Sequence, residues 1–217
     1  MFQLSIISAT AFVRTALDEL VTVEETGMLV DADAVNLQRL VMNSIVEAVV
    51  KTHQGALPIL IDGNMGVQGE DYTAELDNDG VITITMLQDT LRVASVQAED
   101  SPFVLTDIVP EDSAEGRKQL NKYVRGVSDD PRVVLQKRWN EPYRPIMKYY
   151  STEETKCPGI RLEYVPYPMI VESVVYICPQ LEYAVLNELV AMILDSVNQH
   201  EKAALYRAKS KAIMEGK

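Results

Sequence analysis

The two histidines are the first residues to consider for metal binding or acid–base chemistry. His53 and His200 lie far apart in the 217-residue chain, and neither has a second ligand at a spacing typical of metal sites, as in HExxH. Each lies near the end of a predicted helix, so we interpret both as solvated histidines. We therefore expect neither a metal ion nor a cofactor.

Patterns for a nucleophile or a phosphate-binding loop are also missing from the sequence. The glycine-rich segment GNMGVQG at 63–69 lacks the lysine and the following Ser or Thr of a phosphate-binding loop, and we interpret it as a flexible loop. Cys157 has no histidine nearby in the chain, and there is no GxSxG sequence. The carboxylates that can be placed lie mostly in turn-like sequences, such as DNDG at 77–80. We therefore predict that the protein is not an enzyme.

The positive charges of this acidic chain are collected in one window, residues 117–148. The window holds nine Lys/Arg and three Asp/Glu, although the whole chain carries a net charge of −12. Residues 1–116 are at −16 and residues 149–217 at −2. Tyr123, Trp139 and Tyr143 alternate with the basic residues, a composition that could stack single-stranded nucleic acid. In a chain this acidic, a protein surface of opposite charge is the more economical partner.

These basic residues are therefore candidates for contacts with another protein. The predicted contact residues are Arg117, Lys118, Lys122, Tyr123, Arg125 and Arg132. If each copy has an acidic end and a basic loop, copies can pack head to tail, and such a contact closes into a ring when the rotation per copy fits. The alternative is a solvated loop whose bases balance nearby acids, because single exposed ion pairs contribute little stability.

The C-terminal segment after His200 is helix-prone but increasingly polar. It is either a frayed helix end or an arm that becomes ordered when it binds a partner. For the second possibility, a helix laid in a groove of the partner, the predicted contact residues are Lys202, Arg207, Lys209, Lys211, Ile213 and Met214. Deletion of residues 207–217 is then expected to leave the melting temperature of the isolated chain nearly unchanged.

The spacing of apolar residues predicts an α+β fold in a single domain, residues 1–217. Helical spacing covers residues 8–21, 34–53 and 181–200, so that residues 1–56 are mainly helical and residues 180–217 form a closing helix with a basic tail. Between them, residues 57–179 are predicted to form a mostly antiparallel sheet or a small sandwich. The expected strands are residues 59–61, 72–76, 81–86, 91–98, 132–139, 145–150, 161–167 and 174–178.

The sequence also indicates a cellular compartment. The two cysteines, Cys157 and Cys178, are too few for a disulfide framework and are expected to be reduced. The N-terminal residues do not have the pattern of a signal peptide, and no apolar run reaches the roughly 18 residues that a membrane span requires. We therefore expect a protein that stays in a cytoplasm, or is released from it by lysis, and does not enter a membrane.

The order of the segments along the chain is informative in itself. The helix pair SATAFVRTALDEL and VNLQRLVMNSIVEAVV is followed by short strands that include MLQDTLRVAS at 86–95. The basic stretch PEDSAEGRKQLNKYVRG at 110–126 precedes a strand that begins after a proline, and a tyrosine-rich strand and a helix follow at 164–194. Over nearly the whole chain, this order resembles that of the ring-forming head-to-tail adaptor proteins of tailed bacteriophages, in particular those of crAss-like phages.

The resemblance implies a virion structural protein that forms a homo-oligomeric ring, of about twelve copies, at the head–tail junction. Such a ring docks under the portal protein, contacts further tail or ring proteins and continues the DNA channel. An acidic inner surface would repel the phosphates of passing double-stranded DNA, so that the genome slides without specific binding. Assembly would take place in the cytoplasm of the host bacterium. The alternative is a monomeric cytoplasmic module of a phage or prophage that binds another protein.

Overall fold

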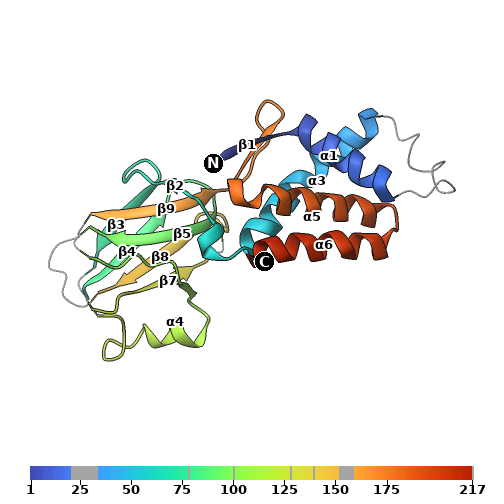
Figure 1. Cartoon of the computed structure of the whole chain (residues 1–217). Coiled ribbons are helices and arrows are strands. Elements are labelled where there is room, and N and C mark those ends of the chain that lie inside the picture. Colours follow the sequence, from blue (N-terminus) through green and yellow to red (C-terminus); the bar gives the residue numbers. More distant parts are fainter. Residues whose placement is uncertain are drawn as a thin grey trace. The chain divides into compact units, whose positions relative to one another are not determined.

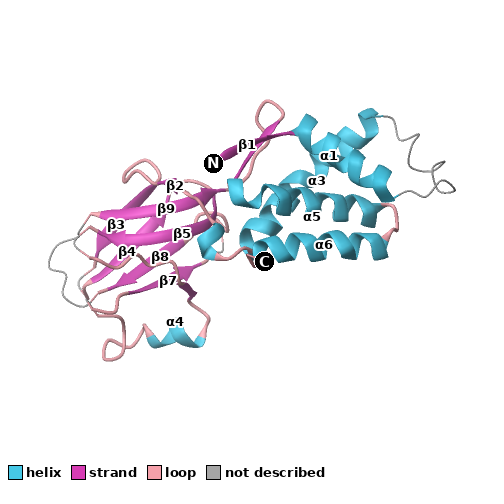
Figure 2. Ribbon diagram, viewed as in Figure 1, coloured by secondary structure: helices cyan, strands magenta, loops and turns pink. Residues whose placement is uncertain are grey.

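The chain divides into two compact units. Residues 1–62 together with 168–217 form one, called the helical unit below, and residues 63–167 form the other, called the β unit. Figure 2 shows that helices dominate the helical unit and strands the β unit, so the predicted α+β class is confirmed. The computed structural model describes residues 1–20, 34–77, 79–99, 101–127, 129–138, 140–151 and 159–216.

Most of the described part of the helical unit is formed by four helices (Figure 1). They are α1 (Ile6–Leu20), α3 (Ala34–Gly55), α5 (Glu182–Ser196) and α6 (His200–Met214). Helix α5 contacts the other three, and all of its residues from Ala184 to Ala191 are buried. Glu188 is the only charged residue in this stretch, which explains why other helices can enclose α5 on several sides.

A two-stranded antiparallel ribbon completes the helical unit. It pairs β1 (Phe2–Ser5) with β10 (Val174–Ile177), and the partners Leu4 and Val175 are both buried in the core of the helices. Strand β1 was not predicted. Residues 59–61 were predicted as a strand but overlap the short 3-10 helix η1 (Pro58–Leu60). A second 3-10 helix, η2 (Pro179–Leu181), leads into α5.

The C-terminal segment, predicted as a closing helix with a basic tail, is helical but divided into two helices. Figure 1 shows α5 and α6 side by side, joined by residues 197–199. Asn198 adopts a φ of +62°, a left-handed conformation that Asn tolerates better than most residues and that ends the first helix. The chain then turns back, and α6 buries Ala203, Tyr206 and Ser210.

In the β unit, two sheets share one core. The five-stranded sheet has the order β3 (Tyr72–Leu76), β4 (Val81–Met86), β8 (Ile146–Tyr150), β7 (Arg132–Gln136) and β6 (Ile108–Pro110). The three-stranded sheet has the order β2 (Asn64–Met65), β9 (Ile160–Pro166) and β5 (Thr90–Ala98). Neighbouring strands are antiparallel except β6 and β7, which are parallel.

Alternating residues of the strands build this core. Ile82, Ile84 and Met86 of β4 lie in the same cluster as Leu162 and Tyr164 of β9. The period of two is the pattern that predicted most of these strands. The short elements β2, β6 and α4 (Ala114–Lys118) were missed, because two to five residues are too few to show a period.

The β3–β4 hairpin turn is closed by Asp77, as the DNDG sequence predicted. Its Oδ1 accepts hydrogen bonds from the backbone N–H of Asp79 and of Val81, both at 2.9 Å, and Gly80 has a φ of +74°. An aspartate that accepts bonds from the backbone two to four residues ahead is typical of tight turns. The turn holds the carbonyl oxygen of Asp79 where Arg125 reaches it.

Candidate interaction surface

The basic segment that begins in the last turn of α4, residues 117–127, is called the basic loop below. Its Gly126 lies against β7 and β8, two strands that contribute Val134 and Tyr150 to a small buried cluster with Val81, apart from the main core. At Gly126 the backbones are so close that a side-chain carbon would lie 2.8 Å from the backbone nitrogen of Arg132 and from the carbonyl oxygen of Tyr150. Glycine is therefore required at this position, and the loop is fixed on the sheet.

Gln119 fixes the loop from inside. Its side chain is buried, and its Oε1 accepts a hydrogen bond of 2.7 Å from the backbone N–H of Gly126. Before the loop, Ser113 caps α4 by accepting a 3.0 Å hydrogen bond from the N–H of Gly116. Gln119 was not predicted as a site residue, because nothing in the local sequence distinguishes a buried glutamine from a solvated one. These hydrogen bonds fix the backbone of the loop. The exposed side chains of the loop are therefore attached to a fixed backbone.

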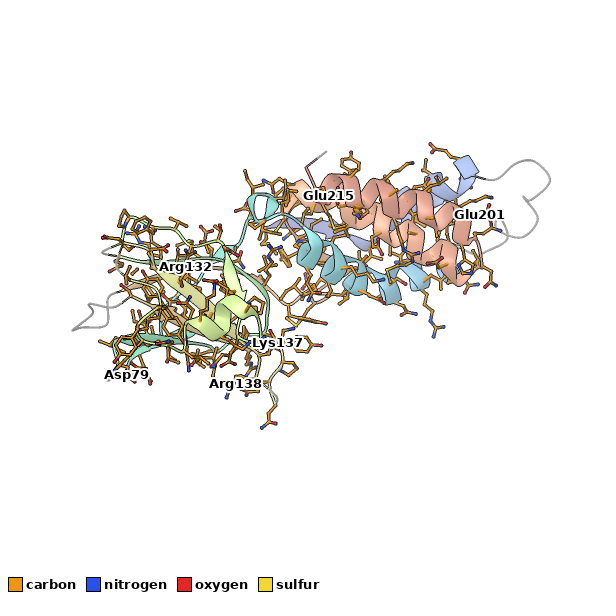
Figure 3. All side chains as sticks on the ribbon, turned by 90° about the horizontal axis from the view of Figure 1, so that it is seen from below. Asp79, Arg132, Lys137, Arg138, Glu201 and Glu215 are labelled. Atoms are coloured by element: carbon orange, nitrogen blue, oxygen red, sulfur yellow. The ribbon has the colours of Figure 1, made fainter. Side chains whose placement is uncertain are left out.

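The predicted contact residues divide into two groups. Lys118 pairs with Glu115 at 3.0 Å and Arg132 with Asp130 at 2.8 Å, and both pairs lie within the β unit. Elsewhere in the window, Arg138 pairs with Glu141 and Arg144 with Asp89. For these four residues the structure agrees with the alternative interpretation, in which basic side chains pair with nearby acidic side chains of the same copy. Figure 3 shows Arg138 and Lys137 away from Arg132, beyond the other end of β7.

The second group lies in the loop and has no carboxylate partner among the described residues. The Arg117 guanidinium donates to the carbonyl oxygen of Ser113 at 3.3 Å, and Arg125 donates to the carbonyl oxygen of Asp79. The Lys122 ammonium lies 5.4 Å from the centre of the Tyr123 ring, within reach of a cation–π interaction. Their positive charges are therefore not neutralised by a neighbouring side chain in the described part of the chain.

Large apolar side chains are exposed beside these charges. Leu120 is 62% exposed, Tyr123 84% and Val124 58%. Together with Lys122 they form what is called the loop surface below. Exposed apolar residues that lie next to one another and carry a flanking charge are typical of protein contact sites, whereas single exposed ones are common everywhere. The loop surface is the strongest candidate for function in the described chain.

The aromatic residues of the window do not gather on one surface. Tyr143 precedes β8 and packs against Tyr167, with 4.3 Å between ring centres and 50° between ring planes, whereas Gly126 of the basic loop lies at Tyr150, the last residue of β8. A hydrogen bond with Tyr143 raises the pKa of the Tyr167 hydroxyl. Trp139 lies outside the described residues. The structure thus gives no support to a stacking platform for single-stranded nucleic acid in this window.

The charge contrast lies within the β unit and not between the two units. Each unit has a net charge of −6. Inside the β unit the window 117–148 is at +6, so the remainder of that unit is at −12. The helical unit contains a shorter basic segment, because α6 has four Lys/Arg and one Glu. The chain therefore carries two basic segments, the window 117–148 and α6, in an otherwise acidic sequence.

The C-terminal segment is packed, so the expectation of a frayed end or a free arm is wrong for residues up to Gly216. Ser210 is fully buried, and its hydroxyl donates to the carbonyl oxygen of Ala184 at 2.9 Å. The carbonyl oxygen of Met214 accepts a 3.1 Å hydrogen bond from the N–H of Leu57, and the Met214 sulfur lies beside Gly55. Deletion of residues 207–217 would remove these contacts from the core.

The predicted docking residues lie on α6, whose two ends are marked by Glu201 and Glu215 in Figure 3. Arg207, Lys209 and Lys211 are exposed, Lys202 is half-buried, and Ile213 and Met214 are partly buried. Arg207 pairs with Asp195, and the Lys209 ammonium lies 4.4 Å above the Tyr206 ring. Hydrogen bonds from His200 and Arg207 hold the pKa of the Asp195 carboxyl below its ordinary value. Arg207 thus supports the α5–α6 pair, whereas the contact of Lys209 with Tyr206 lies within α6.

His53 is fully buried, so its prediction as a solvated histidine is wrong, whereas His200 is exposed as predicted. The Nδ1 of His53 lies 2.9 Å from the carbonyl oxygen of Val49, and its Nε2 accepts a 3.0 Å hydrogen bond from the N–H of Cys178. These partners define the neutral tautomer with the proton on Nδ1. The Cys178 thiol donates to the carbonyl oxygen of Asp62 at 3.3 Å. Cys157 lies outside the described residues.

Within the described ranges, no group of three or more His, Cys, Asp or Glu side chains is placed to hold a metal ion. Among the helices that the structure describes, none is both long and apolar enough for a membrane span. No protein-family model, no curated protein and no solved structure matches this chain.

Proposed function

We propose that the protein is a structural subunit of a phage virion that assembles into a ring between the portal and the tail. The support comes from the segment order that resembles head-to-tail adaptors and, in the structure, from the loop surface. Leu120, Tyr123 and Val124 are exposed on a loop that Gln119 holds in place. A fixed, exposed apolar surface with an uncompensated positive charge is suited to a protein partner.

The asymmetry of the chain supports a ring. The loop surface is basic, while the chain as a whole has a net charge of −12. Two loop surfaces would repel each other, so a self-complementary twofold contact through them is disfavoured. A contact between the loop of one copy and an acidic surface of the next is heterologous, and heterologous contacts generate closed rings when the rotation fits.

The net charge of −12 supports the second part of the proposal, the passage of DNA. Acidic subunits around a channel repel the phosphates of double-stranded DNA, so the genome can move through without binding. In this proposal the portal protein and further tail or ring proteins contact the two faces of the ring. A monomeric module that binds a different protein through the same loop surface is the alternative.

The experiment changes the loop surface while it leaves its supports intact. The double variant Lys122→Glu with Tyr123→Ser is expected to weaken self-association about tenfold or more, because central aromatic contacts and charge pairs dominate such interfaces. Lys137→Glu is the matched control, since it makes the same charge change at an exposed residue of the window outside the loop. Sedimentation gives the association constant, and circular dichroism verifies the fold.

The ring itself is tested in virions. Electron microscopy of purified particles is expected to show this chain with rotational symmetry at the head–tail junction. A chain found only as a cytoplasmic monomer, and absent from particles, would rule out the proposal in favour of the monomeric module. Unchanged self-association of the folded double variant would show that the loop surface is not the subunit contact.

A further inference from the structure

The hairpin turn before β10 has an unusual backbone. The backbone N–H and carbonyl groups of Val171 and Val174 form two hydrogen bonds of 2.9 Å, so the loop between them is only two residues long. Both of these residues have positive φ, +50° at Glu172 and +63° at Ser173. This is the conformation of a type I′ turn, which normally has Asn or Gly at these positions. A Glu–Ser sequence is therefore strained here, and glycine would relieve the strain.

The same turn presents exposed apolar residues around one negative charge. Met169 is 68% exposed, and Val171 and Glu172 are exposed as well. Ile170, between them, packs against the core of the helical unit, and Val174 begins β10, so the turn is anchored on both sides. Between Arg161 and Lys202 the sequence has no Lys or Arg. Met169, Val171 and Glu172 are called the hairpin surface below.

We infer that the hairpin surface of one copy binds the loop surface of the next copy, an inference that rests on the proposed ring. The two surfaces are complementary: one has Met169 and Val171 with the Glu172 carboxylate, the other Leu120, Tyr123 and Val124 with the Lys122 ammonium. Apolar residues of both become buried, and each charge gains a partner of opposite sign. Because the surfaces differ and lie on different units of the chain, the contact is heterologous, as a ring requires.

The strain in the turn agrees with this role. A turn that served only to connect two segments would fold more easily with Asn–Gly, since these residues adopt positive φ readily. Glu172 and Ser173 keep side chains at the tip despite the unfavourable backbone. Such positions persist where a side chain is used, and a carboxylate at the tip is the group that a basic surface would bind. The chain itself carries a basic surface of this kind, so the partner is a second copy of the chain.

The test uses two variants that each damage one surface only. Tyr123→Asp adds a negative charge to the loop surface, and Met169→Asp adds one to the hairpin surface. Each variant alone is expected to stay monomeric at concentrations at which the wild type associates, an affinity loss of about a hundredfold. An equal mixture is expected to form dimers with one copy of each variant and nothing larger, because one intact loop and one intact hairpin remain. Ile59→Asp, at an exposed apolar residue of neither surface, should associate like the wild type.

Other results would overturn the inference in distinguishable ways. In one outcome the wild type associates but the mixture of the two variants stays monomeric. This result would exclude the hairpin–loop contact and leave the ring proposal standing. If the wild type is monomeric at the highest soluble concentration, Tyr123→Cys is mixed with Met169→Cys, both in a Cys157→Ser background, under oxidising conditions. The inference requires a disulfide between copies, and its absence would exclude the contact. The ring proposal is then decided separately by imaging of virions.

Discussion

At the scale of single residues, the two histidines have opposite environments, although both were predicted as solvated residues near helix ends. His53 is enclosed and bonds the carbonyl oxygen of Val49 and the N–H of Cys178, whereas His200 is exposed beside Asp195. The N–H of Cys178 follows β10, far away in the sequence, so the bond connects α3 to the ribbon. His53 thus stabilises the helical unit as a neutral, fully bonded side chain.

The substitution His53→Ala removes an acceptor and a donor from a buried site. We expect a loss of about 2 to 4 kcal/mol in the free energy of unfolding, because backbone groups lose their buried partner and a cavity forms. His200→Ala is the matched control and should cost less than about 1 kcal/mol, since the pair with Asp195 is exposed. Urea denaturation measures both values. Equal losses in the two variants would contradict the structural role of His53.

At the scale of elements, α6 differs most from its prediction, because the expected tail is a packed helix. Its sequence is rich in lysine and suggests a tail, yet Ala203, Tyr206 and Ser210 form a stripe with a spacing of three to four residues. This stripe packs on α5, and the hydroxyl of Ser210 bonds the carbonyl oxygen of Ala184. Small and polar residues at the stripe allow close approach of the helices but give little hydropathy signal. The exposed lysines cover the other side.

Deletion of residues 207–217 is therefore expected to destabilise the protein. The truncated chain loses the Ser210 hydrogen bond, the Met214 contact with Gly55 and the Arg207 pairs, and exposes part of α5. We expect the free energy of unfolding to fall by about 2 kcal/mol or more, which lowers the melting temperature by several degrees. Lys211→Ala, at an exposed residue of the same helix, should change the stability by about 0.5 kcal/mol or less. An unchanged melting temperature after deletion would restore the free-arm interpretation.

At the scale of the whole molecule, the β unit is an insertion between two parts of the helical unit. The chain leaves the helical unit after Asp62 and returns at Pro168. The two ends of the β unit lie near each other, because a side-chain carbon at Gly63 would be 3.0 Å from backbone atoms of Tyr164. The β unit has its own core of two sheets, and the helical unit has its own core around α5.

A fragment of residues 63–167 is expected to fold by itself. Its core and sheets are contained within the range, and inserted units with neighbouring ends tolerate excision well. Thermal unfolding followed by circular dichroism should give one cooperative transition with a β-type spectrum. A fragment that is unfolded at 25 °C would show that the β unit depends on the helical unit. A fragment of residues 1–62 alone is the contrasting case and should not fold, because α5 and α6 are missing from its core.

The amino-acid sequence by itself determined the α+β class, the helices α1, α3 and α5, and the β3–β4 hairpin. Periods of 3.6 and of two residues, and an aspartate that closes a turn, act over a few residues and can be recognised without the rest of the chain. The concentration of basic residues, with Tyr123 among them, is likewise contained in one short segment, whereas the exposure of Leu120 and Val124 was found only in the structure.

The tertiary structure decided the features that depend on residues far apart in the chain. These are the pairing of β1 with β10, the burial of His53 by Cys178, the packing of α6 on α5 and the choice of which basic residues have acidic partners. A strand of four residues or a single histidine has the same local sequence whether it is buried or exposed. The contacts of such a strand or histidine are set by the folded chain, because the free energy gained by burial and pairing depends on residues from the whole core.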